Sequence, residues 1–101
     1  MTKKARALVI AERVLHRADG GPDVIVQLFL PETDGLGHRC NYEIEGVGGT
    51  FRRFATGADS IHAIQMALAK IGIELTLHAK YKDIAFVFGD TADSGFPKPE
   101  V

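Results

Sequence analysis

The stretch GLGHRCNYEIEG, from Gly35 to Gly46, places His38 two residues before Cys40, the only cysteine of the chain. Imidazole and thiolate groups bind zinc, and together they can form a nucleophile and its base. Zinc takes about four ligands, and only Asp34 lies close enough in the sequence to propose as a third. In a strand, His38 and Cys40 point the same way, but nothing forces the ring onto the sulfur. We therefore interpret the stretch as a β-strand with Cys40 as a small core residue.

The rest of the chain contains no other obvious chemical motif. His16, His62 and His78 are dispersed, and no nucleophile, base and orienting group occur together. The glycine-rich segments 35–37 and 46–49 lie between predicted strands, whereas a phosphate loop needs its glycines between a strand and a helix. The sequence therefore favours a protein that is not an enzyme, and it predicts no cofactor.

The composition indicates one small domain. The chain has 101 residues, of which 46% are hydrophobic, and this is enough for a single core. We expect one domain over residues 1–89 and a C-terminal tail over residues 90–101, where proline, glycine and charge interrupt the apolar pattern. The 12 basic and 13 acidic residues are interspersed, so no basic excess exists to bind a nucleic acid.

The same sequence predicts a cytoplasmic location. A lone cysteine cannot form an intramolecular disulfide, which fits a reducing compartment. The basic start leads into five apolar residues, 7–11, fewer than the roughly 7–15 of a signal-peptide core. The longest uncharged apolar run, Val24 to Pro31, is far shorter than the about 20 residues of a membrane-spanning helix. We therefore expect no membrane association.

Five segments have the composition of β-strands, because they are rich in β-branched and aromatic residues or alternate between apolar and polar ones. They are Leu8 to Leu15, Val24 to Pro31, Arg39 to Glu45, Thr50 to Ala55, and Asp83 to Gly89. The segment ETDGLG, residues 32–37, is predicted as a loop.

The segment GVGG, residues 46–49, is predicted to be a hairpin loop between two of these strands. The resulting pairs are Glu45–Thr50, Ile44–Phe51, Glu43–Arg52 and Cys40–Ala55. The apolar pairs share one face and the oppositely charged pair takes the other, as burial of one face requires.

The segment after Gly57 has helical periodicity. Its apolar residues recur at spacings of three and four along one stripe, which comprises Ile61, Ile64, Leu68, Ile71 and Leu75. Asp59 or Ser60 can cap the first turn. We predict a helix from about Asp59 to Ala79, although Gly72 costs about 1 kcal/mol relative to alanine. The alternative ends the helix at Gly72 and makes residues 73–77 a strand.

The order β-β-β-β-α-β predicts an α+β fold. We expect an antiparallel sheet of four to five strands with one long helix packed on one face, because this layout buries both apolar surfaces.

A second apolar strip occurs on the predicted helix. Met66, Ile73 and Leu77 fall roughly opposite the packed stripe and flank Lys70. Such a strip is typical of a homodimer interface or of a surface that binds another protein. Alternatively, the tail with Phe96 or a bend at Gly72 covers it, or Met66 is merely one of the scattered apolar residues of an ordinary surface. We predict Met66, Lys70, Ile73 and Leu77 as partner-binding residues.

Three motifs follow one another at characteristic spacings: CNYEIEG at 40–46, GADSIHAIQMAL at 57–68, and DSGFP at 93–97. Together they resemble a family of short bacterial proteins that is known as a domain of unknown function. The resemblance implies that Asp59 caps the helix and that the Gly-Phe-Pro tail folds back on the domain. It implies no activity.

The favoured hypothesis is a small non-catalytic interaction module, which binds either an unidentified protein partner or a second copy of itself as a homodimer. One alternative is a small-ligand or metal-binding protein that uses His38 and Cys40 at the beginning of their strand. Another, which rests on size and layout alone, is an immunity-like protein that neutralises a toxin.

Overall fold

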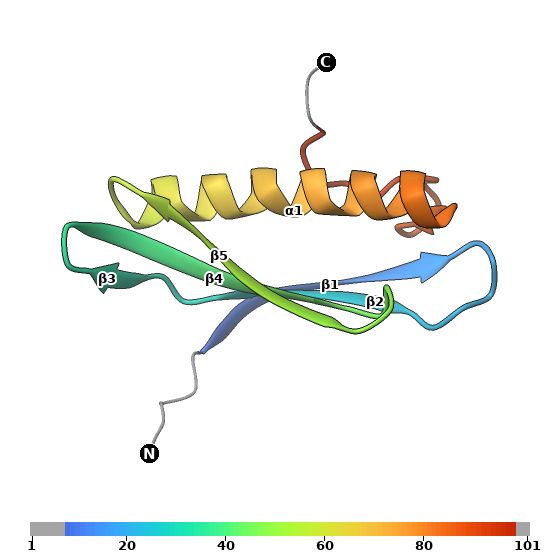
Figure 1. The fold of residues 1–101 in the computed structure, drawn as a ribbon, viewed down its shortest axis with the longest axis horizontal. Helices are drawn as coiled ribbons and strands as arrows, with labels where there is room; N and C mark the ends of the chain where they lie inside the picture. Colours follow the sequence, from blue (N-terminus) through green and yellow to red (C-terminus); the bar gives the residue numbers. More distant parts are fainter. Residues whose placement is uncertain (1–7, 99–101) are drawn as a thin grey trace.

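The structure is a computed structural model, which describes residues 8–98 apart from the side chain of Asp34. A long helix lies across one face of an antiparallel sheet (Figure 1). The elements in chain order are β1 (Val9–Arg17), β2 (Val24–Phe29), β3 (Glu32–Asp34), β4 (Gly37–Glu45), β5 (Thr50–Gly57), α1 (Ser60–Lys82) and β6 (Phe86–Val87). The predicted α+β fold is confirmed.

Strand β4 organises the sheet. Strand β5 pairs along one of its edges, while β2 and then β3 pair along the other. Strand β1 pairs with β2, and β6 adds to β1 at His16 and Arg17. The helix therefore connects the β5 edge of the sheet to the opposite edge, where β6 lies.

One predicted loop and one predicted strand differ from the structure. The segment predicted as a loop contains β3, because Pro31, which lacks an N–H, interrupts the ladder only briefly before pairing resumes at Glu32. The last strand is Phe86–Val87 rather than Asp83 to Gly89. Asp83 instead ends the helix in a left-handed conformation, and the chain turns at Gly89, which has a φ of 61°.

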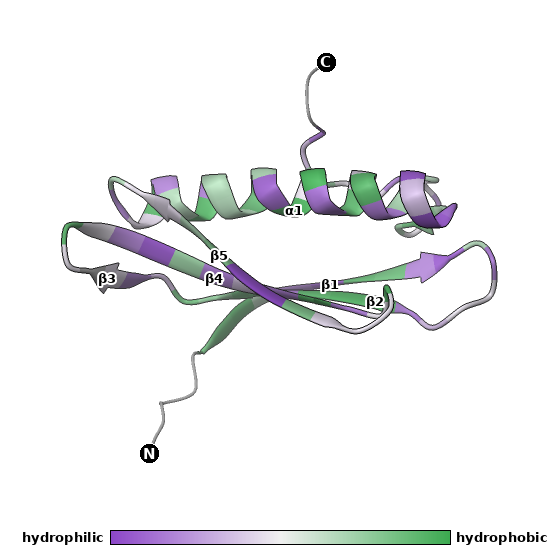
Figure 2. Ribbon diagram, in the orientation of Figure 1, coloured by the Kyte–Doolittle hydropathy of each residue, from purple (hydrophilic) through white to green (hydrophobic). Residues whose placement is uncertain are grey.

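The predicted hairpin register is confirmed. Glu45 pairs with Thr50 across the loop of residues 46–49, and every predicted pair follows in the same register. On the face away from the helix, Arg52 Nε donates to Glu43 Oε2 at 2.7 Å. Hydropathy alternates along these strands accordingly (Figure 2).

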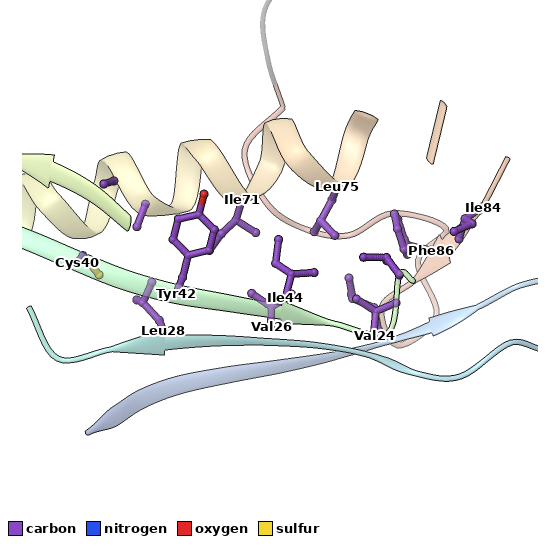
Figure 3. Packing of buried hydrophobic residues seen from close by; sticks show 14 of the residues in the cluster. Val24, Val26, Leu28, Cys40, Tyr42, Ile44, Ile71, Leu75, Ile84 and Phe86 are labelled. Carbon is purple, nitrogen blue, oxygen red and sulfur yellow. The ribbon is translucent and has the colours of Figure 1, made fainter. Parts of the chain in front are cut away.

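The core fills the space between the sheet and α1. Alternate residues of β2 and β4 point toward the helix, and the buried residues of α1 point toward the sheet (Figure 3). The strand residues are Val24, Val26, Leu28, Cys40, Tyr42 and Ile44, and the helix residues are Ala63, Ala67, Ile71 and Leu75. Most of these strand residues are large, and the first half of the helix packs on them with two alanines, Ala63 and Ala67.

The helix starts and continues as predicted. Asp59 caps it by accepting from the His62 N–H at 2.7 Å, and α1 runs past Gly72 to Lys82. The predicted apolar stripe is wrong at Ile61, whose exposed fraction is 66%. A Cβ added at Gly57 would lie 2.4 Å from the backbone nitrogen of Ala63, so this turn packs closely on β5 through Ala63 and leaves Ile61 toward solvent.

Gly72 is buried under the C-terminal tail. A Cβ at this position would lie 1.7 Å from the carbonyl oxygen of Pro97, so the close approach of the tail requires glycine. Phe96 packs beside the core, and the Arg13 guanidinium lies 4.8 Å from the centre of its ring. Arg13 also donates to the carbonyl oxygen of Ser94 at 3.2 Å. These contacts hold the described part of the tail against α1 and β1.

Candidate functional site

The four predicted partner-binding residues lie together on one flank of α1. We call Met66, Lys70, Ile73 and Leu77 the exposed flank. Met66, Ile73 and Leu77 are 41%, 42% and 46% exposed. Lys70 Nζ donates to the carbonyl oxygen of Phe54 in β5 at 2.9 Å, so this flank lies toward β5 rather than directly opposite the core.

The described part of the tail, residues 90–98, does not cover the exposed flank. It reaches the helix at Gly72, and Phe96 lies with Leu68 and Ile71 beside β1 and β2. These contacts are on the side of α1 away from Lys70 and β5. The alternative in which the tail buries this strip is therefore wrong for the described part of the tail, and Ile73 and Leu77 stay accessible.

A hollow of about 470 Å³ lies at the C-terminal end of the exposed flank. Its walls come from β5 and from the last turns of α1. The lining residues are Arg53, Glu74, Leu77, His78, Tyr81 and Lys82. Tyr81 is 75% exposed, and Lys82 Nζ donates to the carbonyl oxygen of Val47 at 2.6 Å. The hollow thus combines apolar walls with cationic groups.

Glu74 joins the hollow to the core. The hydroxyl of buried Tyr42 donates to Glu74 Oε2 at 2.5 Å, and Arg53 Nε donates to Glu74 Oε1 at 3.1 Å. Burial, followed by the hydrogen bond with this carboxylate, raises the pKa of Tyr42, so the phenol stays a proton donor. Each oxygen of Glu74 therefore has a partner, and its charge is balanced by Arg53.

His78 is sensitive to the charge around the hollow. Its ring centre lies 5.2 Å from that of Phe51. Partial burial lowers the pKa of His78 below its ordinary value of 6.5, and the positive charges of Lys82 and Arg53 lower it further, against an opposing effect of Glu74. Cations therefore outweigh the single carboxylate at this position.

This pKa shift predicts a pH dependence of stability. The unfolded chain protonates His78 near the ordinary pKa of 6.5, whereas the folded chain resists protonation until a lower pH. The free energy of unfolding should therefore fall as the pH drops from about 6.5 toward the folded-state pKa. Urea unfolding between about pH 7.5 and 5.5 measures this slope. In His78→Gln the slope should be shallower, and equal slopes would contradict the prediction.

A second hollow of about 440 Å³ lies where β4 and β5 meet the start of α1. His38 and His62 both line it. His38 Nδ1 is buried without a hydrogen-bond partner, and His62 Nδ1 accepts from the Ala58 N–H at 3.0 Å. The sequence did not pair these histidines, because their meeting depends on how β5 leads into the helix.

The alternative in which His38, Cys40 and Asp34 form a ligand or metal site finds no support in the described part of the protein. Cys40 is fully buried, its Sγ lies 3.5 Å from the carbonyl oxygen of Phe29, and burial raises the pKa of the thiol. The side chain of Asp34 lies outside the described residues. No three His, Cys, Asp or Glu side chains among those described could hold a metal ion. Cys40 therefore acts as a core residue.

Among residues 8–98, no helix combines the length and apolar character that crossing a membrane would require. The model of a family described as a domain of unknown function (DUF6968) matches residues 11–98 of the chain. Neither the curated proteins nor the solved structures yielded a match. The family match includes the exposed flank and both hollows, and it confirms the predicted resemblance to a domain of unknown function.

Proposed function

The chain belongs to the DUF6968 family, whose function is unknown, and we propose that it is a non-catalytic protein-interaction module that binds through the exposed flank of α1. The observation that carries this proposal is the position of three large apolar side chains, Met66, Ile73 and Leu77, in solvent on one side of a helix that already has a well-packed core. Helices commonly recognise partners through apolar residues at such spacings.

Two further features support this role. Lys70 is held against β5 by its hydrogen bond to the carbonyl oxygen of Phe54, which fixes the position of the one cation within the flank. The described part of the tail packs on the other side of the helix and does not cover the flank. The lone, buried cysteine also fits the reducing environment of the cytoplasm, which we propose as the location.

Site-specific photo-crosslinking in cells tests the proposal. A benzophenone amino acid at position 73 should give a discrete adduct, whereas the same group at Gln65, an exposed helix residue outside the flank, should give none. An adduct with twice the mass of the chain would identify a homodimer, and any other mass a different protein partner. Failure to crosslink at position 73, or equal adducts at both positions, would overturn the proposal.

Binding of a small ligand or metal is a second candidate function. It is favoured by one observation, the buried and unpartnered Nδ1 of His38, a residue that lines the second hollow together with His62. Native mass spectrometry of the full chain after incubation with zinc tests it. A retained ion that His62→Ala abolishes would support this function, and no retained ion would exclude zinc.

A further inference from the structure

Positive charge borders the exposed flank. Between residues 60 and 82, α1 carries Lys70, Lys80 and Lys82 but only one carboxylate, Glu74. Both oxygens of Glu74 are hydrogen-bonded, one of them to Arg53 of β5. The lysine contacts with the Phe54 and Val47 carbonyl oxygens leave the lysine charges intact, because a carbonyl carries no net charge. The flank therefore presents apolar side chains beside lysines that form no ion pair among the described residues.

The hollow at the end of the flank repeats this combination at a smaller scale. Leu77 and Tyr81 supply apolar walls, and Arg53 and Lys82 supply cations. The Arg53 side chain is 51% exposed despite its ion pair, so its remaining N–H groups are accessible. An incoming carboxylate would find charge-assisted donors here, because the one acid among the lining residues, Glu74, already has a partner for each oxygen.

We propose, on the basis of the interaction role above, that the partner segment is an acidic amphipathic helix. Its apolar face packs on Met66, Ile73 and Leu77, and its acidic side chains face Lys70, Lys80 and the hollow. One carboxylate enters the hollow near Arg53 and Lys82.

Charge complementarity favours this occupant over a second copy of the chain. Two copies of α1 packed flank to flank would bring Lys70 and Lys80 of both helices into one seam, with no unpaired carboxylate on α1 to offset them. Like charges in an interface are costly and select against such pairing. An acidic helix satisfies the same cations and buries the same apolar side chains.

Two synthetic peptides of about 18 residues test the proposal against the full chain. Both carry leucines at spacings of three and four, and their remaining positions are mainly glutamate in one and lysine in the other. Fluorescence anisotropy should give at least about tenfold tighter binding of the glutamate peptide, and this preference should weaken between about 50 and about 200 mM salt. Equal affinities, or no binding of either peptide, would overturn the proposal.

A charge-reversal pair locates the binding. Lys80→Glu should weaken the glutamate peptide several-fold, whereas Lys98→Glu, a reversal on the tail that also breaks the ion pair with Asp93, should not. Equal losses of affinity in the two variants would overturn the assignment of this surface. So would NMR chemical-shift changes on peptide binding that do not affect Ile73 and Leu77.

Two other binding partners of the exposed flank, a second copy of the chain and an anionic membrane, are distinguished by separate measurements. Self-association that Ile73→Glu abolishes in light scattering would assign the flank to a second copy. Binding to vesicles with about one-third phosphatidylserine, without binding of the glutamate peptide, would assign it to an anionic membrane. In either case, or if the identified partner segment is not acidic, the inference fails. A crosslink at position 73 decides the interaction role separately.

Discussion

Gly46→Ala is expected to lower the free energy of unfolding by about 3 kcal/mol or more, and this is among the largest effects of any small substitution in the chain. Gly46 has a φ of 106°, which L side chains rarely adopt. A Cβ here would also lie 2.2 Å from the carbonyl oxygen of Asp23, a backbone atom that cannot rotate away. The hairpin would have to separate from the start of β2.

Gly49→Ala in the same loop provides the matched control. Gly49 also has a positive φ, 144°, but a Cβ at this position would meet no atom within 4 Å. It should therefore show only the conformational cost, about 1 to 2 kcal/mol. Urea unfolding followed by circular dichroism measures both variants. Equal losses would mean that the close approach of Gly46 to β2 does not contribute.

The strands and helix were largely predictable because their patterns are local. The register between β4 and β5 followed from the loop at residues 46–49, since one register alone sorts apolar and charged pairs onto opposite faces. Strand β3 was not predictable, because its three residues follow Pro31 and carry no apolar pattern. The exposure of Ile61 depends on how closely the helix approaches Gly57, which local periodicity does not encode.

The candidate site was predictable in part for the same reason. Met66, Ile73 and Leu77 share one side of a helix, so their spacing alone groups them. The sequence did not indicate the hollow beside them, because its residues come from different elements. Glu74 of α1 contacts Arg53 of β5 and Tyr42 of β4. Such contacts depend on tertiary packing. The sequence offered one indication of the Tyr42 contact. Alternate residues of a strand share a face, and this places Tyr42 on the same face of β4 as Cys40 and Ile44.

Tyr42→Ala is the second substitution with a large expected effect. Tyr42 is fully buried, and it is the largest fully buried side chain of the described residues. Removing its ring would leave a cavity beside Ile71 and remove the proton donor to Glu74, so the free energy of unfolding should fall by about 3 to 5 kcal/mol. Urea unfolding measures the loss, and a fall below about 1 kcal/mol would contradict the packing described here.

Tyr42→Phe separates the hydroxyl from the ring. It keeps the packing but leaves Glu74 Oε2 without its donor, and it should therefore cost about 1 to 2 kcal/mol. Combined with Glu74→Ala, which leaves no acceptor at this position, in a double-mutant cycle, the two changes should be non-additive by about 1 kcal/mol, because each removes the same hydrogen bond. Additive effects would mean that Tyr42 and Glu74 contribute separately. A coupled pair would instead show that the core fixes the carboxylate that holds Arg53 at the edge of the hollow, so that the position of this cation depends on the interior of the fold.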